Sequence, residues 1–317
     1  MEKLVFIMDS RFHGNDTNVI VVIPAKAGIH PMQESFSHKI PKSLILLYWR
    51  TNAMKIFITA DYEGVSGLVQ WNSVGEREAI TADINSAIAG AFDGGAKEVL
   101  VGEAHANMRN IIPEMLDPRV KFLSGQPKPL NHIGGLDSTF DAVMLVAYHS
   151  KSGTWKGIMA HTYTGSVFSL KFNGIEVGEL GTDSAIAGHF GVPVILVTGD
   201  KAGCDEALSL LGDVETVAVK EGVSRSAGKC LHPQEARKLI REGAKRSMGR
   251  IGTIKPFVID PPIKAEVVFV DPTYADNLEP LPFIERVDGR TITFTDSNFI
   301  DAFEIFNMVQ FYGGSVR

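Results

Sequence analysis

The sequence has very few cysteines, with only Cys204 and Cys230 among 317 residues. Two thiols cannot build the disulfide framework of a small secreted protein, so we expect a protein of the reducing cytoplasm. Neither cysteine lies in a recognisably reactive context, and each is expected to be a small apolar side chain rather than a nucleophile. The shortage of thiolates also argues against a cysteine-rich structural zinc site.

Basic residues and long apolar runs are scarce as well. The chain has 31 Lys and Arg against 37 Asp and Glu, for a formal charge of −6. Phosphate binding needs a basic face, so this balance argues against a nucleic-acid partner. The apolar stretch 43–49 is far shorter than the about 20 residues of a membrane span. It also begins too late in the chain for a secretory signal. We therefore predict no membrane association.

Residues 1–53 differ in character from the rest of the chain. They contain SRFHGNDTNVIVVIPAKAGIH, which resembles the translation of a dispersed bacterial intergenic repeat. A second methionine, Met54, stands directly before a well-formed core strand. We predict that translation starts at Met54 and that residues 1–53 are a spurious or disordered leader; a targeting peptide is the alternative. The remaining chain has 25 basic and 33 acidic residues, a charge of −8.

From Met54 onward, short apolar runs alternate with helical stretches, which predicts βα units and a largely parallel sheet. The expected strands are 56–60, 98–101, 120–123, 142–147, 166–172, 193–198 and 216–219, and the expected helices are 77–92, 182–190, 200–211 and 233–248. Asn173-Gly174 predicts a hairpin turn. Beyond Pro256 and the pair Pro261-Pro262 we expect strands 265–269 and 291–295 and a helix over 297–312. The prediction is an α/β fold whose mostly parallel central sheet is flanked by helices. It divides into a catalytic domain, 54–255, and a smaller C-terminal α+β subdomain, 256–317.

Five acidic and histidine residues lie where strands are expected to end: Asp61, Glu63, His105, His149 and Glu179. Ligands bind outside the carboxyl ends of strands in open α/β sheets, so we expect these side chains to meet. Asp61 and Glu63 share one side of a strand because they are two residues apart. Taken singly, each has a structural alternative, such as a loop histidine or an acidic residue in the first turn of a helix. Only their convergence predicts a metal site.

The five side chains offer the oxygen and nitrogen ligands that suit Zn²⁺, Mn²⁺ or Co²⁺. A catalytic zinc needs three protein ligands, whereas five with a central carboxylate suit two ions about 3.5–4 Å apart. We predict that Asp61, at the tip of its strand, bridges the two ions. A sixth residue, His161, could be a ligand, an acid–base group or an electrophile. His132, His189 and His232 are expected to have structural roles, and no substrate-binding residue is evident.

The ordered motifs DYEGVSG, EAHANM, YH, MAH and VGELG, followed by SRSAGKCLHP, resemble the bacterial zinc D-aminopeptidases of the dipeptide-transport operon. The resemblance runs from Met54 nearly to the C-terminus. It implies a dinuclear zinc aminopeptidase that removes N-terminal D-residues from short peptides such as D-Ala-D-Ala. It also implies bridging by Asp61, completion of the zinc shells by the other four residues and a catalytic His161, in a ring-shaped homodecamer. The family's usual Asp two residues before the first histidine is Glu103 here.

Two other functions remain open from the residues alone. A phosphatase of the haloacid dehalogenase type also begins with an apolar strand and paired carboxylates, but it uses Mg²⁺ and no histidines. A non-catalytic metal-binding subunit is the second alternative, although structural zinc sites are normally closed and rich in thiolates. The site therefore favours a metallohydrolase, and the resemblance implies that it acts on peptide bonds.

Overall fold

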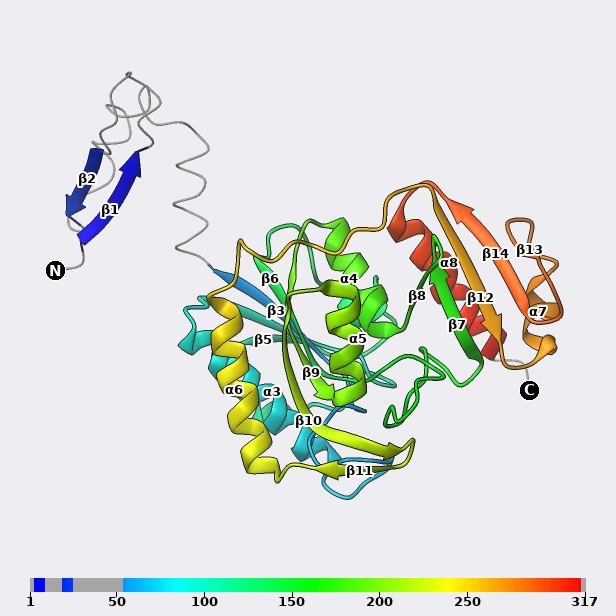
Figure 1. Cartoon of the computed structure of the whole chain (residues 1–317), viewed down its shortest axis with the longest axis horizontal. Helices are drawn as coiled ribbons and strands as arrows, with labels where there is room; N and C mark the ends of the chain where they lie inside the picture. The colour runs from blue at the N-terminus through cyan, green and yellow to red at the C-terminus, as the bar shows by residue number, and fades with distance from the viewer. Residues whose placement is uncertain (1–2, 9–18, 25–53, 315–317) are drawn as a thin grey trace. The chain divides into compact units, whose positions relative to one another are not determined.

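The computed structural model describes residues 3–8, 19–24 and 54–314, and the chain divides into two units, Met1–Asn52 and Ala53–Arg317 (Figure 1). In the first unit, β1 (Lys3–Met8) pairs antiparallel with β2 (Val19–Pro24). The rest of the predicted leader 1–53 lies outside the described residues, so its assignment stays a prediction.

The second unit is built on a seven-stranded sheet with the order β11-β10-β9-β6-β3-β4-β5 (Figure 1). Its strands are β3 (Lys55–Ala60), β4 (Glu98–Glu103), β5 (Lys121–Leu123), β6 (Ala142–Tyr148), β9 (Val194–Asp200), β10 (Glu215–Ser224) and β11 (Ala227–Cys230). Every neighbouring pair is parallel except β10 with β11. The prediction of a mostly parallel central sheet is confirmed.

Helices cover both faces of this sheet because its central strands are apolar on both sides. On β3, Ile56 and Ile58 pack in one hydrophobic cluster, whereas Phe57 packs in the other. The first cluster includes α3 (Glu76–Asp93) and α6 (Pro233–Met248), and the second includes α4 (Glu179–His189) and α5 (Lys201–Leu211). The alternation of side chains along each strand thus fixes which helices lie on which face.

A second, antiparallel sheet has the order β13-β14-β12-β7-β8 (Figure 1). It consists of β7 (Val167–Phe172), β8 (Ile175–Val177), β12 (Ile263–Phe269), β13 (Glu285–Arg286) and β14 (Thr291–Asp296). The helices α7 (Pro272–Leu278) and α8 (Phe299–Gly314) pack against it. Strands from both sides of the predicted boundary at residue 255 join in this sheet. The division into domains at that boundary stays a proposal.

Several expectations differ from the structure in detail. The turn at Asn173-Gly174 joins β7 to β8 as predicted, and both residues have positive φ. The helix expected over 182–190 instead begins at Glu179, so this residue opens α4 and does not end a strand of the central sheet. The predictions missed β8, β11, β13 and α7, which are short or mostly exposed and lack a clear apolar period. Among the described residues, no helix is long and apolar enough to cross a membrane.

The strand β6 has a bulge near its end, just before His149. The register of β6 against β9 shifts between Leu145 and Tyr148, and Ala147 has φ 59°. Gly64 and Gly199 accommodate the bulge, since a β-carbon on either would overlap its backbone. Bulges of this kind re-aim a side chain at the rim of a sheet.

The substitution Gly199→Ala tests this packing. A β-carbon at this position would overlap the carbonyl oxygen of Tyr148. We expect a loss of about 2 kcal/mol or more in the free energy of unfolding, at the upper part of the range for overpacked cores. Gly289→Ala is the control, because a β-carbon there meets no atom within 4 Å. Thermal or denaturant unfolding measures both, and equal stability of the two variants would contradict the bulge.

Candidate metal centre

Three neighbouring strands of the central sheet deliver four of the predicted site residues. β3 ends at Ala60, so Asp61 follows it directly and Glu63 comes two residues later. β6 ends at Tyr148, so His149 is the next residue, and His105 comes two residues after the end of β4. The chain passes from β3 to β4 on one side of β3 and returns to β6 on the other. Such a reversal opens a crevice at the carboxyl ends of the strands.

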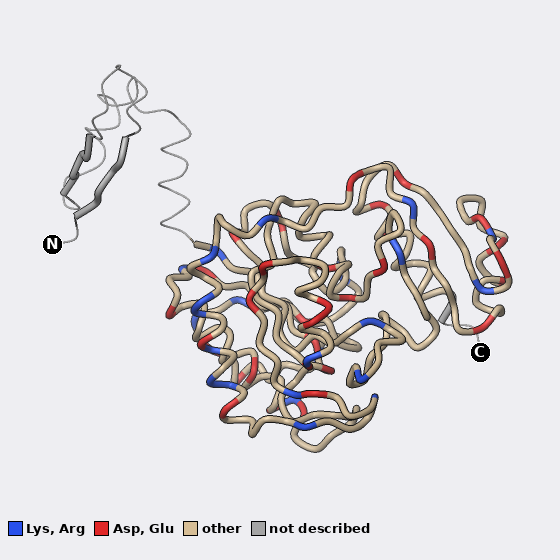
Figure 2. Tube along the Cα trace, in the orientation of Figure 1, with Lys and Arg blue, Asp and Glu red and all other residues tan. Residues whose placement is uncertain are grey.

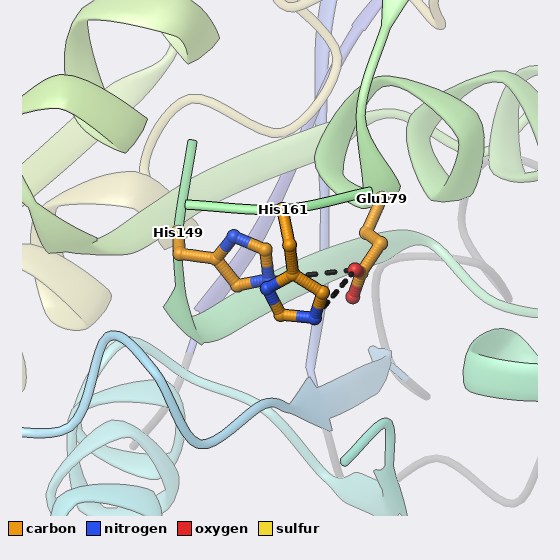
Figure 3. Close-up of side chains that lie close together, drawn as sticks. All are labelled: His149, His161 and Glu179. Atoms are coloured by element: carbon orange, nitrogen blue, oxygen red, sulfur yellow. Dashed lines mark ion pairs between the residues drawn. The ribbon is translucent and has the colours of Figure 1, made fainter. Parts of the chain in front are cut away.

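The remaining two residues come from outside these strand ends. Glu179 is the first residue of α4, and the backbone N–H of Tyr163 donates to its Oε1 at 2.6 Å. His161 lies in the loop between β6 and β7. Figure 3 shows its ring stacked on that of His149, with Glu179 beside both. The two ring centroids are 4.3 Å apart and the planes differ by 10°.

The two carboxylate oxygens of Asp61 face different histidines. Its Oδ1 lies 3.7 Å from His105 Nδ1, and its Oδ2 lies 3.3 Å from His149 Nε2. On the first side, Glu63 Oε2 lies 3.2 Å from His105 Nδ1. On the second side, Glu179 Oε1 lies 3.4 Å from the Nε2 atoms of both His149 and His161. The other four predicted ligands are therefore grouped around the carboxylate of Asp61.

Backbone carbonyls set the proton positions on two of the imidazoles. His149 Nδ1 lies 2.8 Å from the carbonyl oxygen of Ser150, and His161 Nδ1 lies 2.9 Å from that of Met159. A carbonyl oxygen can only accept, so each Nδ1 carries a proton. In the neutral rings this leaves each Nε2 as a lone pair directed toward Glu179. A metal-binding histidine is held in the same way.

Burial and close contact shift the pKa values of the charged groups in the site. Burial raises the pKa of Asp61 well above its ordinary value, and repulsion by Glu63 adds to the effect. Burial also opposes ionisation of Glu179, but His149 and His161 outweigh it and lower the pKa of Glu179 to about 2. The pKa of His161 is lowered by burial and by repulsion from His149. Burial and repulsion from His149 thus favour a neutral His161, although Glu179 and Glu63 act in the opposite direction.

The donor atoms fit a metal ion better than they fit one another. Asp61 Oδ2, Glu63 Oε2 and His149 Nε2 are buried and form no hydrogen bond with the described residues. Buried polar atoms normally have a hydrogen-bonding partner or bind an ion, and a metal ion would supply that partner here. Among the described residues, Asp61, Glu63 and His149 form one potential metal-binding group, and His149, His161 and Glu179 form another. The geometry thus admits His161 as a ligand as well as an acid–base group.

Two residues that the sequence did not single out hold Glu63 and its loop. The indole Nε1 of Trp71 donates to Glu63 Oε1 at 2.5 Å. The buried Nζ of Lys220 donates to the backbone carbonyls of Glu63, Val65 and Leu68 at 2.5, 2.8 and 2.5 Å. Burial lowers the pKa of Lys220 to about 8. A single side chain from β10 thus fixes the loop that follows β3.

Behind Glu179 lies a buried network that includes His132, for which we expected only a structural role. His132 Nδ1 is 3.9 Å from Glu179 Oε2 and 3.3 Å from Asp183 Oδ2. The hydroxyl of Tyr148 donates to the same Asp183 oxygen at 2.6 Å. One feature of the sequence could have indicated this network. Glu179 and Asp183 are four residues apart, which puts both carboxylates on one face of a helix.

Glu103, which stands where the resemblance implies an Asp, holds the His105 loop by its backbone. Its carboxylate accepts from the backbone N–H of Asn110 at 2.6 Å and of Ile111 at 3.3 Å. The side chain of Asn110 in turn donates to the carbonyl of His105 at 2.9 Å. The longer carboxylate therefore acts on His105 through the loop rather than through its ring.

Known proteins resemble this chain over most of its length. Residues 54–308 match the model of a peptidase family described as D-aminopeptidase. A D-aminopeptidase of Bacillus subtilis (strain 168) is 34% identical over 262 residues, which cover 79% of this chain and 94% of the relative. A solved structure described as the Zn-dependent D-aminopeptidase DppA from Bacillus subtilis, a self-compartmentalizing protease, aligns with a TM-score of 0.80. That alignment is 31% identical and covers 83% of this chain and 99% of the other. The predicted family resemblance and fold class are confirmed.

A thermal-shift measurement tests whether the site binds metal, independently of activity. Zinc added to chelator-treated protein at about 100 times its dissociation constant should add about 2.7 kcal/mol to the free energy of unfolding. For a unit of this size the shift in Tm is on the order of 5–10 °C. The Asp61→Asn variant should lose at least half of the shift, and the control Asp271→Asn, at the start of α7, should retain it. The absence of a shift with Zn²⁺, Mn²⁺ and Co²⁺ would contradict the metal site.

Proposed function

The chain belongs to the D-aminopeptidase family of peptidases, and from this premise we propose that it is a dinuclear zinc aminopeptidase. It would remove the N-terminal residue from short peptides, in particular D-amino-acid peptides such as D-Ala-D-Ala. It is a hydrolase, and the family match favours a peptidase over the phosphatase and the non-catalytic metal-binding subunit. The solved relative is described as Zn-dependent, which supports zinc as the metal.

The observation that carries the dinuclear proposal is the position of Asp61. One of its oxygens faces His105 and the other faces His149. A bridging carboxylate needs this arrangement, because each oxygen binds a different ion. Glu63 lies beside His105, and Glu179 lies beside His149. We therefore assign Asp61, Glu63 and His105 to one ion and Asp61, His149 and Glu179 to the other.

Bound zinc ions lower the pKa of a water molecule and polarise the scissile carbonyl. The chain itself supplies acid–base chemistry through His161. Its Nδ1–H is held by the carbonyl of Met159, so its Nε2 is the atom that exchanges a proton. Nε2 lies 3.4 Å from Glu179 Oε1, at the edge of the proposed metal site. A neutral imidazole there can accept a proton from the attacking water and deliver it to the leaving amine.

The relative's description as a self-compartmentalizing protease supports an assembly of several copies. We propose that this chain forms a homo-oligomer, by resemblance a ring-shaped decamer, and that it acts on short peptides in the cytoplasm. Short substrates are consistent with active sites that are enclosed within an assembly. The two unpaired cysteines are consistent with a reducing compartment.

Hydrolysis of D-Ala-D-Ala and L-Ala-L-Ala by zinc-loaded enzyme tests the function. We expect cleavage of the D,D-peptide, two zinc ions per chain and loss of activity after chelation. Asp61→Asn should lower kcat/KM by at least about 10³-fold, because it removes the shared ligand of both ions. Full activity of the chelated enzyme or of Asp61→Asn would refute the proposal.

The substitution His161→Asn separates catalysis from metal binding. We expect kcat to fall by about 10²–10⁴-fold, the usual contribution of a general acid–base group. The zinc content should stay at the wild-type value. His189→Asn, at the exposed end of α4, is the control and should keep full activity. Loss of one zinc ion from the His161 variant would instead identify this histidine as a ligand.

A further inference from the structure

A cavity of about 500 Å³ opens beside His161. Its walls come from two segments, the loop between β6 and β7 and the tip of the β10–β11 hairpin. The volume lies within the range of pockets that bind small ligands. Because His161 belongs both to this wall and to the metal centre, a molecule in the cavity would touch the proposed reaction site.

The charged residues of the cavity wall are all basic. Lys156 contributes from the loop and Arg225 from the hairpin, and no Asp or Glu belongs to the wall. This is a local departure from the rest of the second unit, where acidic and basic positions are interspersed (Figure 2). Among the described residues, no carboxylate forms an ion pair with either side chain. The cavity is therefore suited to an anionic group.

Contacts between the loop and the hairpin fix the backbone that carries these two residues. The backbone N–H of Met159 donates to the carbonyl of Arg225 at 2.8 Å, and Arg225 Nε donates to the carbonyl of Ala160 at 3.2 Å. Lys156 has φ 60°, and its carbonyl packs so closely on Gly222 that a β-carbon there would overlap it. The position of Arg225 relative to His161 is thus set by backbone contacts.

Arg225 also contacts Trp71, the residue that donates a hydrogen bond to Glu63. Its guanidinium carbon lies 5.3 Å from the centroid of the Trp71 ring, within the range of a cation–π contact. The same indole donates to Glu63 and meets the ring of His161 edge-on, with the centroids 6.0 Å apart. One Arg side chain of the cavity wall therefore contacts an indole that touches both a proposed ligand and the proposed acid–base group.

We propose that this cavity binds the free C-terminal carboxylate of a short peptide, with Arg225 and Lys156 as the recognising cations. The inference rests on the proposed function, which places the N-terminal residue and the scissile bond at the metal centre. Arg225 has two Nη amino groups besides its bonded Nε, and a guanidinium can hold a carboxylate through two parallel hydrogen bonds. Small residues in the wall, such as Gly153, Ala160 and Gly165, leave room for the small residue that carries this carboxylate. The preferred substrates would be dipeptides and tripeptides with an ionised C-terminus.

The test compares D-Ala-D-Ala with its C-terminal amide on zinc-loaded enzyme. We expect the wild type to favour the acid in kcat/KM by about 10–100-fold, the discrimination that a charge-assisted hydrogen bond supplies. Arg225→Gln and Lys156→Gln should each lower this acid-to-amide ratio, Arg225→Gln by about tenfold or more. Arg225→Lys should retain part of it. Lys229→Gln, on the same hairpin but outside the cavity wall, is the matched control and should leave the ratio unchanged.

The ratio distinguishes recognition of the carboxylate from a structural effect. A variant that merely disturbs the His161 loop would lower the rates on acid and amide equally, and this result would overturn the inference. A wild-type ratio near one would also overturn the inference, although hydrolysis of both compounds would leave the proposed function intact.

If zinc-loaded wild type cleaves neither compound, the proposed function fails. Calorimetric titration of both compounds into chelator-treated protein then decides the inference alone. Tighter binding of the acid, reduced in Arg225→Gln, would support it, and equal or undetectable binding would overturn it.

Discussion

The structure of the site depends on the repulsion among buried carboxylates around Asp61. Glu63 follows it on the same loop and Glu179 approaches from α4, and all three side chains are almost fully buried. Carboxylates held together in a low dielectric cannot all ionise unless a cation lies among them. Burial raises the pKa of Asp61 while neighbouring histidines lower that of Glu179. Divalent cations bound among these carboxylates would remove their mutual repulsion.

The surrounding backbone is built to hold this unfavourable cluster. Lys220 reaches from β10 to three carbonyls of the loop that carries Glu63. Gly64 and Gly199 accommodate the bulge of β6 that precedes His149. These contacts fix the loops rather than neutralise the carboxylates, since the Lys220 ammonium bonds to carbonyl oxygens. The folded chain therefore fixes the backbone segments that carry the proposed ligands, and such support is what a selective metal site needs.

Much of the fold and of the site could be predicted from the sequence because their signals are local. Apolar runs such as 142–147 mark buried parallel strands, and polar residues directly after them mark the strand ends where ligands meet. Contacts between distant segments left no such signal. Lys220 and Trp71 are distant from or separate in pattern from Glu63 in the sequence, and only the fold brings them into contact with it. His132 likewise contacts Asp183, which lies one helical turn after Glu179. An isolated lysine, tryptophan or histidine in a sequence is more often structural, so only the three-dimensional arrangement could identify these three.

Glu179 shows why the second sheet belongs to the site. It is the one proposed ligand that no strand of the central sheet delivers, because α4 begins at Glu179 directly after β8. β8 pairs with β7, and β7 pairs with β12 from Ala265↔Phe172 to Phe269↔Val167. The strand after residue 255 therefore supports the hairpin that positions Glu179. A subdomain over 256–317 would then act as part of the metal centre's scaffold, since the position of one ligand depends on its pairing with residues 167–172.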